Sequence, residues 1–156
     1  MLLRDDEVIS NSIRTLDELK YLWEKNHSVA SHVIFIGHGK ENAINFGGRW
    51  VSPDELNKTL DVKEVSPKQF VSLCCHTGCA NFGRKFSQFP ICESLILPFQ
   101  SVHGSIASQF CQTYFACHLL HGQTTRVAFK QARDRVTGTI NFRLWKNGEM
   151  IVGPKT

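Results

Sequence analysis

Two segments of the sequence indicate how the chain folds. Residues 32–39 read HVIFIGHG, and residues 69–78 read QFVSLCCHTG. Each stretch begins with a run of β-branched, aromatic and aliphatic residues that is typical of a buried strand. Each run then breaks at a glycine-containing segment that is typical of a tight loop. The sequence therefore predicts two interior strands, over 32–36 and 69–74, followed by loops that carry a histidine and a cysteine.

Helical patterns alternate with strand patterns on both sides of these stretches. Thr15 and Ser52 each precede a glutamate by three residues, as helix N-caps do, and predict helices to about Lys25 and Leu60. The other predicted elements are strands over 7–9 and 93–98, a hairpin over 44–51, helices over 105–120 and 125–136, and a hairpin over 140–152. Strands separated by helices predict an α/β fold with a mostly parallel sheet and helices on both faces.

The composition is that of one globular domain. The chain has 156 residues, 42% of them hydrophobic and 21% charged, without repeats or linkers, so we expect a single domain over residues 1–156. No apolar run approaches the roughly 18 residues that a membrane helix needs. Charged residues at 4–7 stand where the apolar part of a signal peptide would lie, so we expect a cytoplasmic protein that does not bind a membrane.

Cysteine content and net charge indicate the redox environment of the chain and disfavour one class of binding partner. Without a signal sequence, the six cysteines are best interpreted as thiols in a reducing cytosol. The net charge of +4 comes from basic residues scattered along the chain without a dense basic stripe. This pattern disfavours direct binding of nucleic acid.

His38 and Cys75 are the candidate catalytic pair. The interval between them fits one strand–helix–strand crossover, which takes roughly 30 residues or more. A parallel, right-handed crossover brings both residues to the carboxyl edge of the sheet, where open α/β folds bind their ligands. Alternation along the strand predicts that Cys74 lies under a helix while Cys75 turns out into the loop.

A thiol beside an imidazole is suited to cleavage of a peptide bond. A free thiol is only about 3% ionised at neutral pH, so a nearby imidazole that takes its proton activates it. The same imidazole can protonate the departing amine. Backbone N–H groups of Gly39 and Cys75 are candidates for the oxyanion hole.

These residues resemble the caspase-like (clan CD) cysteine peptidases, most closely the CHAT-type branch. The resemblance rests on an apolar strand before His38-Gly39 and an apolar strand before Cys75-x-Thr77-Gly78. Later positions also fit the family pattern: Phe110, Phe115, Leu119-Leu120-His121-Gly122, Ala128 and Ala132-Arg133. Two positions depart from it, because Cys74 stands where the family usually has a small residue and His76 where an acidic residue is common. The likeness covers roughly residues 30–152.

The resemblance implies a caspase-like three-layer sandwich and a cysteine endopeptidase that acts on a protein substrate without a metal or cofactor. It implies that Cys75 is the nucleophile and His38 the general acid and base. CHAT-type domains are typically joined to sensor domains and often act in prokaryotic signalling or antiviral defence. We therefore expect regulation by a separate protein subunit or by self-association.

Other interpretations of the same residues remain open. Cys74, Cys75, His76 and Cys79 could ligate zinc, although four ligands within six positions do not converge readily on one ion. Residues 79–84 nearly match the Cys-x5-Arg loop of phosphatases but are one residue short. A caspase-like module that binds partners without catalysis is a further alternative. The remaining cysteines, at 92, 111 and 117, are expected in the core, and His103, His118 and His121 at the surface or at helix ends.

Overall fold

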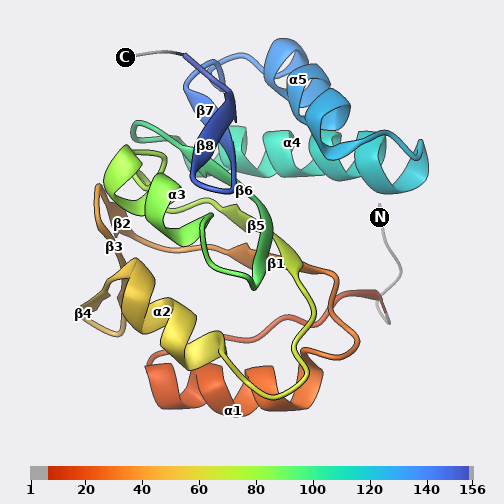
Figure 1. The fold of residues 1–156 in the computed structure, drawn as a ribbon. Coiled ribbons are helices and arrows are strands. Elements are labelled where there is room, and N and C mark those ends of the chain that lie inside the picture. The colour runs from red at the N-terminus through yellow and green to blue at the C-terminus, as the bar shows by residue number, and fades with distance from the viewer. Residues whose placement is uncertain (1–6, 155–156) are drawn as a thin grey trace.

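The computed structural model describes residues 7–154 and shows a mixed α/β fold (Figure 1). The charged residues 4–6 that bear on the signal-peptide prediction lie outside this range. The helices are α1 (Leu16–Asn26), α2 (Pro53–Leu60), α3 (Ala80–Phe86), α4 (Gly104–Phe115), the π-helical η2 (Ala116–Leu120) and α5 (Thr125–Arg135). The strands are β1 (His32–Phe35), β2 (Gly39–Lys40), β3 (Ala43–Phe46), β4 (Arg49–Val51), β5 (Lys68–Ser72), β6 (Cys92–Pro98), β7 (Phe142–Lys146) and β8 (Glu149–Val152).

The main sheet is mixed rather than mostly parallel. Its strand order is β1-β5-β6-β7-β8. β1, β5 and β6 run parallel, whereas β7 and β8 pair antiparallel. The prediction of a mostly parallel sheet is therefore correct only for the first three strands. The C-terminal strands form the predicted hairpin, in which Asn147 and Gly148 adopt the positive φ values that a tight turn needs.

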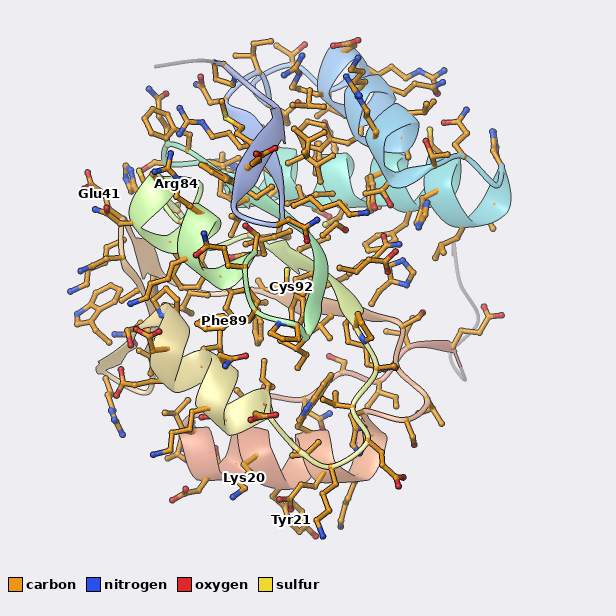
Figure 2. The ribbon with its side chains drawn as sticks, viewed as in Figure 1. Lys20, Tyr21, Glu41, Arg84, Phe89 and Cys92 are labelled. Carbon is orange, nitrogen blue, oxygen red and sulfur yellow. The ribbon has the colours of Figure 1, made fainter. Side chains whose placement is uncertain are left out.

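Helices cover both faces of this sheet, as predicted. Adjacent strand residues point to opposite faces, so Phe70 packs with α1, α2 and α3, whereas Val71 packs with α4 and α5. Leu95 and Ile96 divide in the same way. Figure 1 shows the two helical layers above and below the sheet. In Figure 2, Lys20 and Tyr21 extend outward from α1, while Cys92 lies in the interior.

Local signals place the starts of α1 and α2 where they were predicted, whereas α3 was not predicted. Thr15 and Ser52 cap α1 and α2, and Glu18 and Glu55 complete the two capping boxes. Gly122 follows η2 with a φ of 64°, which permits the chain to leave the helix.

A second, smaller sheet extends from the end of β1. It has the strand order β2-β3-β4, and the predicted turn at residues 47–48 joins β3 to β4. The backbone N–H of Asn45 donates to the carbonyl oxygen of His38 at 2.9 Å. The small sheet therefore fixes the backbone of the loop that carries His38.

Three predicted elements differ from the structure. Residues 8 and 9 do not form the expected strand. The predicted helix over 105–120 divides into α4 and η2. The strand expected to reach residue 74 ends at Ser72, because the chain turns there to form the cysteine loop. Within residues 7–154, no helix has the length and apolar character needed to cross a lipid bilayer.

Candidate active site

Three loops meet at the carboxyl edge of the parallel strands. Residues 36–38 follow β1, residues 73–79 follow β5, and residues 99–103 follow β6. β5 lies between β1 and β6, so the cysteine loop lies between the other two. The first two loops carry His38 and Cys75, which the crossover spacing placed at this edge.

Direct backbone contact joins the histidine loop to the cysteine loop. A Cβ atom on Gly39 would lie 2.6 Å from the carbonyl oxygen of Cys75 and 2.8 Å from both Cys74 Cβ and Thr77 Cγ2. Real Cβ atoms do not approach so closely, so only glycine fits at position 39. The N–H of Leu73 also donates to the carbonyl of Phe35 at 2.8 Å and extends the β1–β5 pairing up to the loops.

The hydroxyl groups of Thr77 and Ser72 stabilise the backbone of the cysteine loop through hydrogen bonds. The buried Thr77 donates from Oγ1 to the carbonyl oxygen of Cys74 at 2.7 Å and lies 3.2 Å from Ser72 Oγ. Ser72 Oγ in turn accepts from the N–H of Cys74 at 3.2 Å. This internal network fixes the backbone on both sides of Cys75.

His76, directly after the candidate nucleophile, has a strained backbone. Its φ of 63° lies in the left-handed region that non-glycine residues rarely occupy. Its Nε2 lies 3.0 Å from Ser101 Oγ in the third loop. Strain of this kind persists only where the surroundings impose it, and it is concentrated at functional sites.

The end of the cysteine loop is anchored to β6 and β7. Gly78 donates from its N–H to the carbonyl of Pro98 at 2.8 Å, and a Cβ there would lie 2.8 Å from that same oxygen. Arg143, which is 4% exposed, donates to the carbonyl of Gly78 at 3.2 Å. Its guanidinium also lies 3.7 Å from the centre of the Phe99 ring. A buried cation therefore braces the loop, and burial lowers its pKa.

The three thiols of this region differ in exposure. Cys75 is half-buried, and its Sγ lies 4.0 Å from the carbonyl oxygen of Val102. Cys74 is fully buried, as predicted, and burial raises the pKa of its thiol. Burial, and then Glu41, raise the pKa of Cys79, while Arg143 acts in the opposite direction. Cys74 and Cys79 are therefore held in the thiol form that does not attack carbonyl groups.

The His38 side chain is exposed to solvent. Among residues 7–154, no hydrogen bond joins its imidazole to Cys75 or to another side chain. The structure thus brings the two loops together but leaves the imidazole and the thiol unbonded. Catalytic hydrogen bonds are often long or misaligned without substrate, so this geometry is compatible with a pair that closes on binding.

The zinc and phosphatase interpretations gain no support from the geometry. In the part of the chain that the structure describes, no cluster of three or more histidine, cysteine, aspartate or glutamate side chains could hold a metal ion. Cys79 is the N-cap of α3, and residues 80–86 are helical rather than an open loop. Arg84 is exposed on that helix (Figure 2), so it does not close a phosphate cradle with Cys79.

The third loop and Arg143 are site features that sequence reasoning missed. The predicted strand over 93–98 ends beside the cysteine loop, where Pro98 accepts from Gly78, and its parallel direction was the available signal for residues 99–103. The sequence did not indicate that Arg143 is buried, because an arginine in a hairpin normally lies at the surface.

A separate cavity of about 550 Å³ is lined by Gln109, Gln112, Thr113, Arg135, Val136 and Thr137, none of which belongs to the three loops.

No protein-family model matches the chain, and no curated protein resembles it.

Proposed function

We propose that this chain is a cysteine endopeptidase of the CHAT-type, caspase-like class. The observation that carries the proposal is the contact between the two loops, in which Gly39 lies against the carbonyl of Cys75 too closely for any side chain. A half-buried thiol and an exposed imidazole then belong to adjoining loops at the carboxyl edge of a sheet. Open α/β sheets bind their ligands at this edge.

The reaction begins with transfer of the Cys75 proton to the His38 imidazole. The Cys75 sulfur attacks the scissile carbonyl carbon, and an S–C bond forms while the carbonyl electron pair moves onto oxygen. Backbone N–H groups of Gly39 and Cys75 stabilise that oxyanion. The carbonyl re-forms as the C–N bond breaks, and His38 returns the proton to the departing amine. His38 then takes a proton from water, whose oxygen displaces Cys75 as the thiol and completes hydrolysis.

The fold is consistent with the caspase-like class at a finer level. Two helical layers enclose the sheet, and a small three-stranded sheet stands between the histidine strand and the next helix. Most of the residues that resemble the family from Phe110 to Ala132 lie in α4, η2 and α5, which form one of these layers, and His121-Gly122 directly follows η2. Its substrate is a protein, and it needs neither metal nor cofactor.

We further propose a cytoplasmic role in prokaryotic signalling or antiviral defence. A regulatory subunit or self-association supplies the activating signal. The exposed, unbonded His38 favours regulation, because a switch that orders this side chain above Cys75 would turn the site on.

Reaction with a thiol-directed peptide probe tests the nucleophile. The full-length chain is treated with a peptidyl chloromethyl ketone, and the modified cysteines are identified by mass spectrometry. We expect modification at Cys75 before Cys79, which is also half-buried. Cys75→Ala should abolish that reaction, whereas Cys79→Ser, as the matched control, should preserve it.

Cleavage of unfolded casein tests the histidine. His38→Ala should slow cleavage by about 10²–10⁴-fold, the usual contribution of general acid–base catalysis. The exposed His121 provides the control, and His121→Ala should leave the rate unchanged. Equal labelling of Cys75 and Cys79 together with no cleavage of casein would overturn the proposal. That result would favour a caspase-like binding module without catalytic activity.

A further inference from the structure

β1 is the outermost strand of the main sheet, and its other edge has no paired strand within residues 7–154. The carbonyls of Ser31 and Phe35 accept from Gln69 and Leu73, toward β5. In a parallel ladder, alternate residues direct both backbone polar groups to the same neighbour. The N–H and C=O groups of His32, Ile34 and Ile36 therefore face the open edge.

This edge lacks the features that normally block further pairing. Exposed edge strands usually carry lysine, proline or a bulge. Residues 32–37 contain no lysine, acidic residue or proline. Ile34 is 43% exposed and Ile36 is 81% exposed. An uncharged edge with exposed isoleucines is a surface that favours a partner strand.

A second apolar group lies at the opposite end of β1. His118 in η2 packs against His32 with ring centroids 5.3 Å apart, so η2 stands beside the start of the strand. The next two residues, Leu119 and Leu120, are 40% and 57% exposed. Exposed aliphatic side chains thus lie at both ends of β1, on η2 at its start and at Ile36 at its finish.

We propose that a second copy of this chain pairs with β1 in antiparallel orientation, about a twofold axis that passes between the two Ile34 residues. In this register Ile34 lies opposite Ile34 of the second copy, and His32 lies opposite Ile36. All three residues present their backbone groups to the edge, so three hydrogen-bonded pairs form. The two five-stranded sheets then become one continuous sheet.

The surface is complementary to itself, which favours a second copy over an unrelated partner. A twofold axis carries Ile36 of one copy to the start of β1 in the other, where Leu119 and Leu120 are exposed. Ile36 of each copy therefore covers Leu119 and Leu120 of the other copy, and the two contacts are equivalent, as in an isologous interface. No charged side chain of residues 32–37 opposes a like charge across the axis. The net charge of +4 per chain acts at longer range, so we expect added salt to strengthen association.

Pairing also has a consequence for the proposed active site, which rests on the proposed peptidase function. β1 leads into the loop of His38. The antiparallel register carries the exposed Val29 of the second copy toward that loop. Association would therefore order His38, which is exposed and unbonded in the single chain.

Sedimentation of the full-length chain over a range of concentrations tests the interface. The short strand and small apolar area correspond to a dissociation constant on the order of micromolar. Ile34→Lys should raise that constant by at least about tenfold, because it places two ammonium groups at the axis. Val127→Lys is the matched control: Val127 is 44% exposed but lies on α5, and its substitution should leave the constant unchanged.

Hydrogen exchange of the Ile34 and Ile36 amides identifies what covers the edge. Protection that increases with protein concentration in the wild type, and not in Ile34→Lys, supports pairing of two copies. Protection that is independent of concentration would mean that the chain's own residues cover β1, and would overturn the proposal. A monomer at every concentration, or equal weakening by Val127→Lys, would overturn it too. A dimer in which Cys75 reacts with the peptide probe no faster than Cys79 would contradict the peptidase proposal but would still support pairing of two copies.

Discussion

Single residues decide how closely the histidine loop and the cysteine loop approach each other. At Gly39 and Gly78 a Cβ atom would meet backbone atoms at 2.6–2.8 Å, and backbone cannot move aside as a flexible side chain can. Next to them, His76 holds a left-handed conformation, and Thr77 bonds the carbonyl of Cys74. The loop geometry therefore depends on small residues and on backbone contacts, more than on a bond between His38 and Cys75.

Gly39→Ala should separate the two loops. The added methyl group would meet the carbonyl of Cys75, so either the histidine loop or the cysteine loop must shift. We expect the free energy of unfolding to fall by about 1–3 kcal/mol, the usual cost of overpacking. We also expect peptide-probe labelling of Cys75 to fall. Urea denaturation and the labelling rate measure the two effects.

Gly104→Ala is the control for that substitution. Gly104 begins α4, directly after the third loop, and a Cβ there meets nothing within 4 Å. This variant should retain both stability and labelling. If Gly39→Ala also retained wild-type labelling, close approach of the loops would be unnecessary for Cys75 reactivity.

At the scale of elements, local sequence signals were sufficient where the structure depends on local bonds. The capping boxes of α1 and α2 and the turn at residues 147–148 were all predicted, because each forms within a few residues. The prediction of a strand over 7–9 was wrong. The β-propensity of an apolar residue acts through packing against neighbouring strands, and Val8 and Ile9 are 48% and 57% exposed. The division of the 105–120 helix into α4 and η2 also escaped prediction.

In the candidate site, too, features that depend on neighbouring residues were predicted and features that depend on distant residues were not. The sequence alone predicted that His38 and Cys75 lie at the same edge of the sheet, because it shows where the two strands end and how long the crossover between them is. The bond between His76 and Ser101 joins residues 25 positions apart, and the bond between Arg143 and Gly78 joins residues 65 positions apart. Pairs this distant depend on how the strands align, and a single sequence does not specify that alignment.

The contact between β1 and η2 should make stability depend on pH. Burial, and then the neighbouring His118, lower the pKa of His32 from its ordinary value of 6.5, while Gln69 and Glu93 oppose the shift. The unfolded chain therefore binds a proton near pH 6.5 when the folded chain does not. The stabilisation is complete above that pH and is lost as the pH falls below it. We expect the urea midpoint to decrease between about pH 7.5 and pH 5.5, a window that brackets the ordinary histidine pKa.

His32→Asn should reduce this dependence, because it removes the group whose pKa is lowered. His121→Asn provides the comparison, since His121 is exposed beyond the end of η2 and should leave the dependence as in the wild type. Both variants are measured at one fixed protein concentration. Identical pH dependence in wild type and His32→Asn would assign the effect to other groups.

For the whole molecule, one sheet serves two separate cores. Phe70, Leu95 and Trp145 belong to the core with α1, α2 and α3, whereas Val71 and Ile96 belong to the core with α4 and α5. These residues alternate along shared strands, so neither core can lose its packing without disturbing the strands that the other uses. The two cores should therefore unfold together as one cooperative unit, in keeping with a single domain.

Phe110→Ala tests this cooperation. The substitution removes packing on one face of the sheet, whereas the tryptophan residues that report unfolding lie on the other face. Phe110 is a fully buried residue of α4 that packs against Phe129 of α5, and its ring centroid lies 4.3 Å from that of Phe142. The variant should lose about 3–5 kcal/mol of unfolding free energy. Both buried tryptophans, Trp23 and Trp145, lie in the other core, and their fluorescence should nevertheless report the lower midpoint.

Far-UV circular dichroism supplies the second probe for the same variant, because it follows the helices of both layers. One cooperative unit requires the fluorescence and dichroism midpoints to fall together. Val127→Ala, at an exposed position on the same helical layer, should change stability by no more than about 0.5 kcal/mol. A fluorescence midpoint that stays at its wild-type value while the dichroism transition splits would mean that the α4–α5 layer unfolds alone. In that case the sheet would not couple the cysteine loop, which bonds to β6 and β7, to the layer behind it.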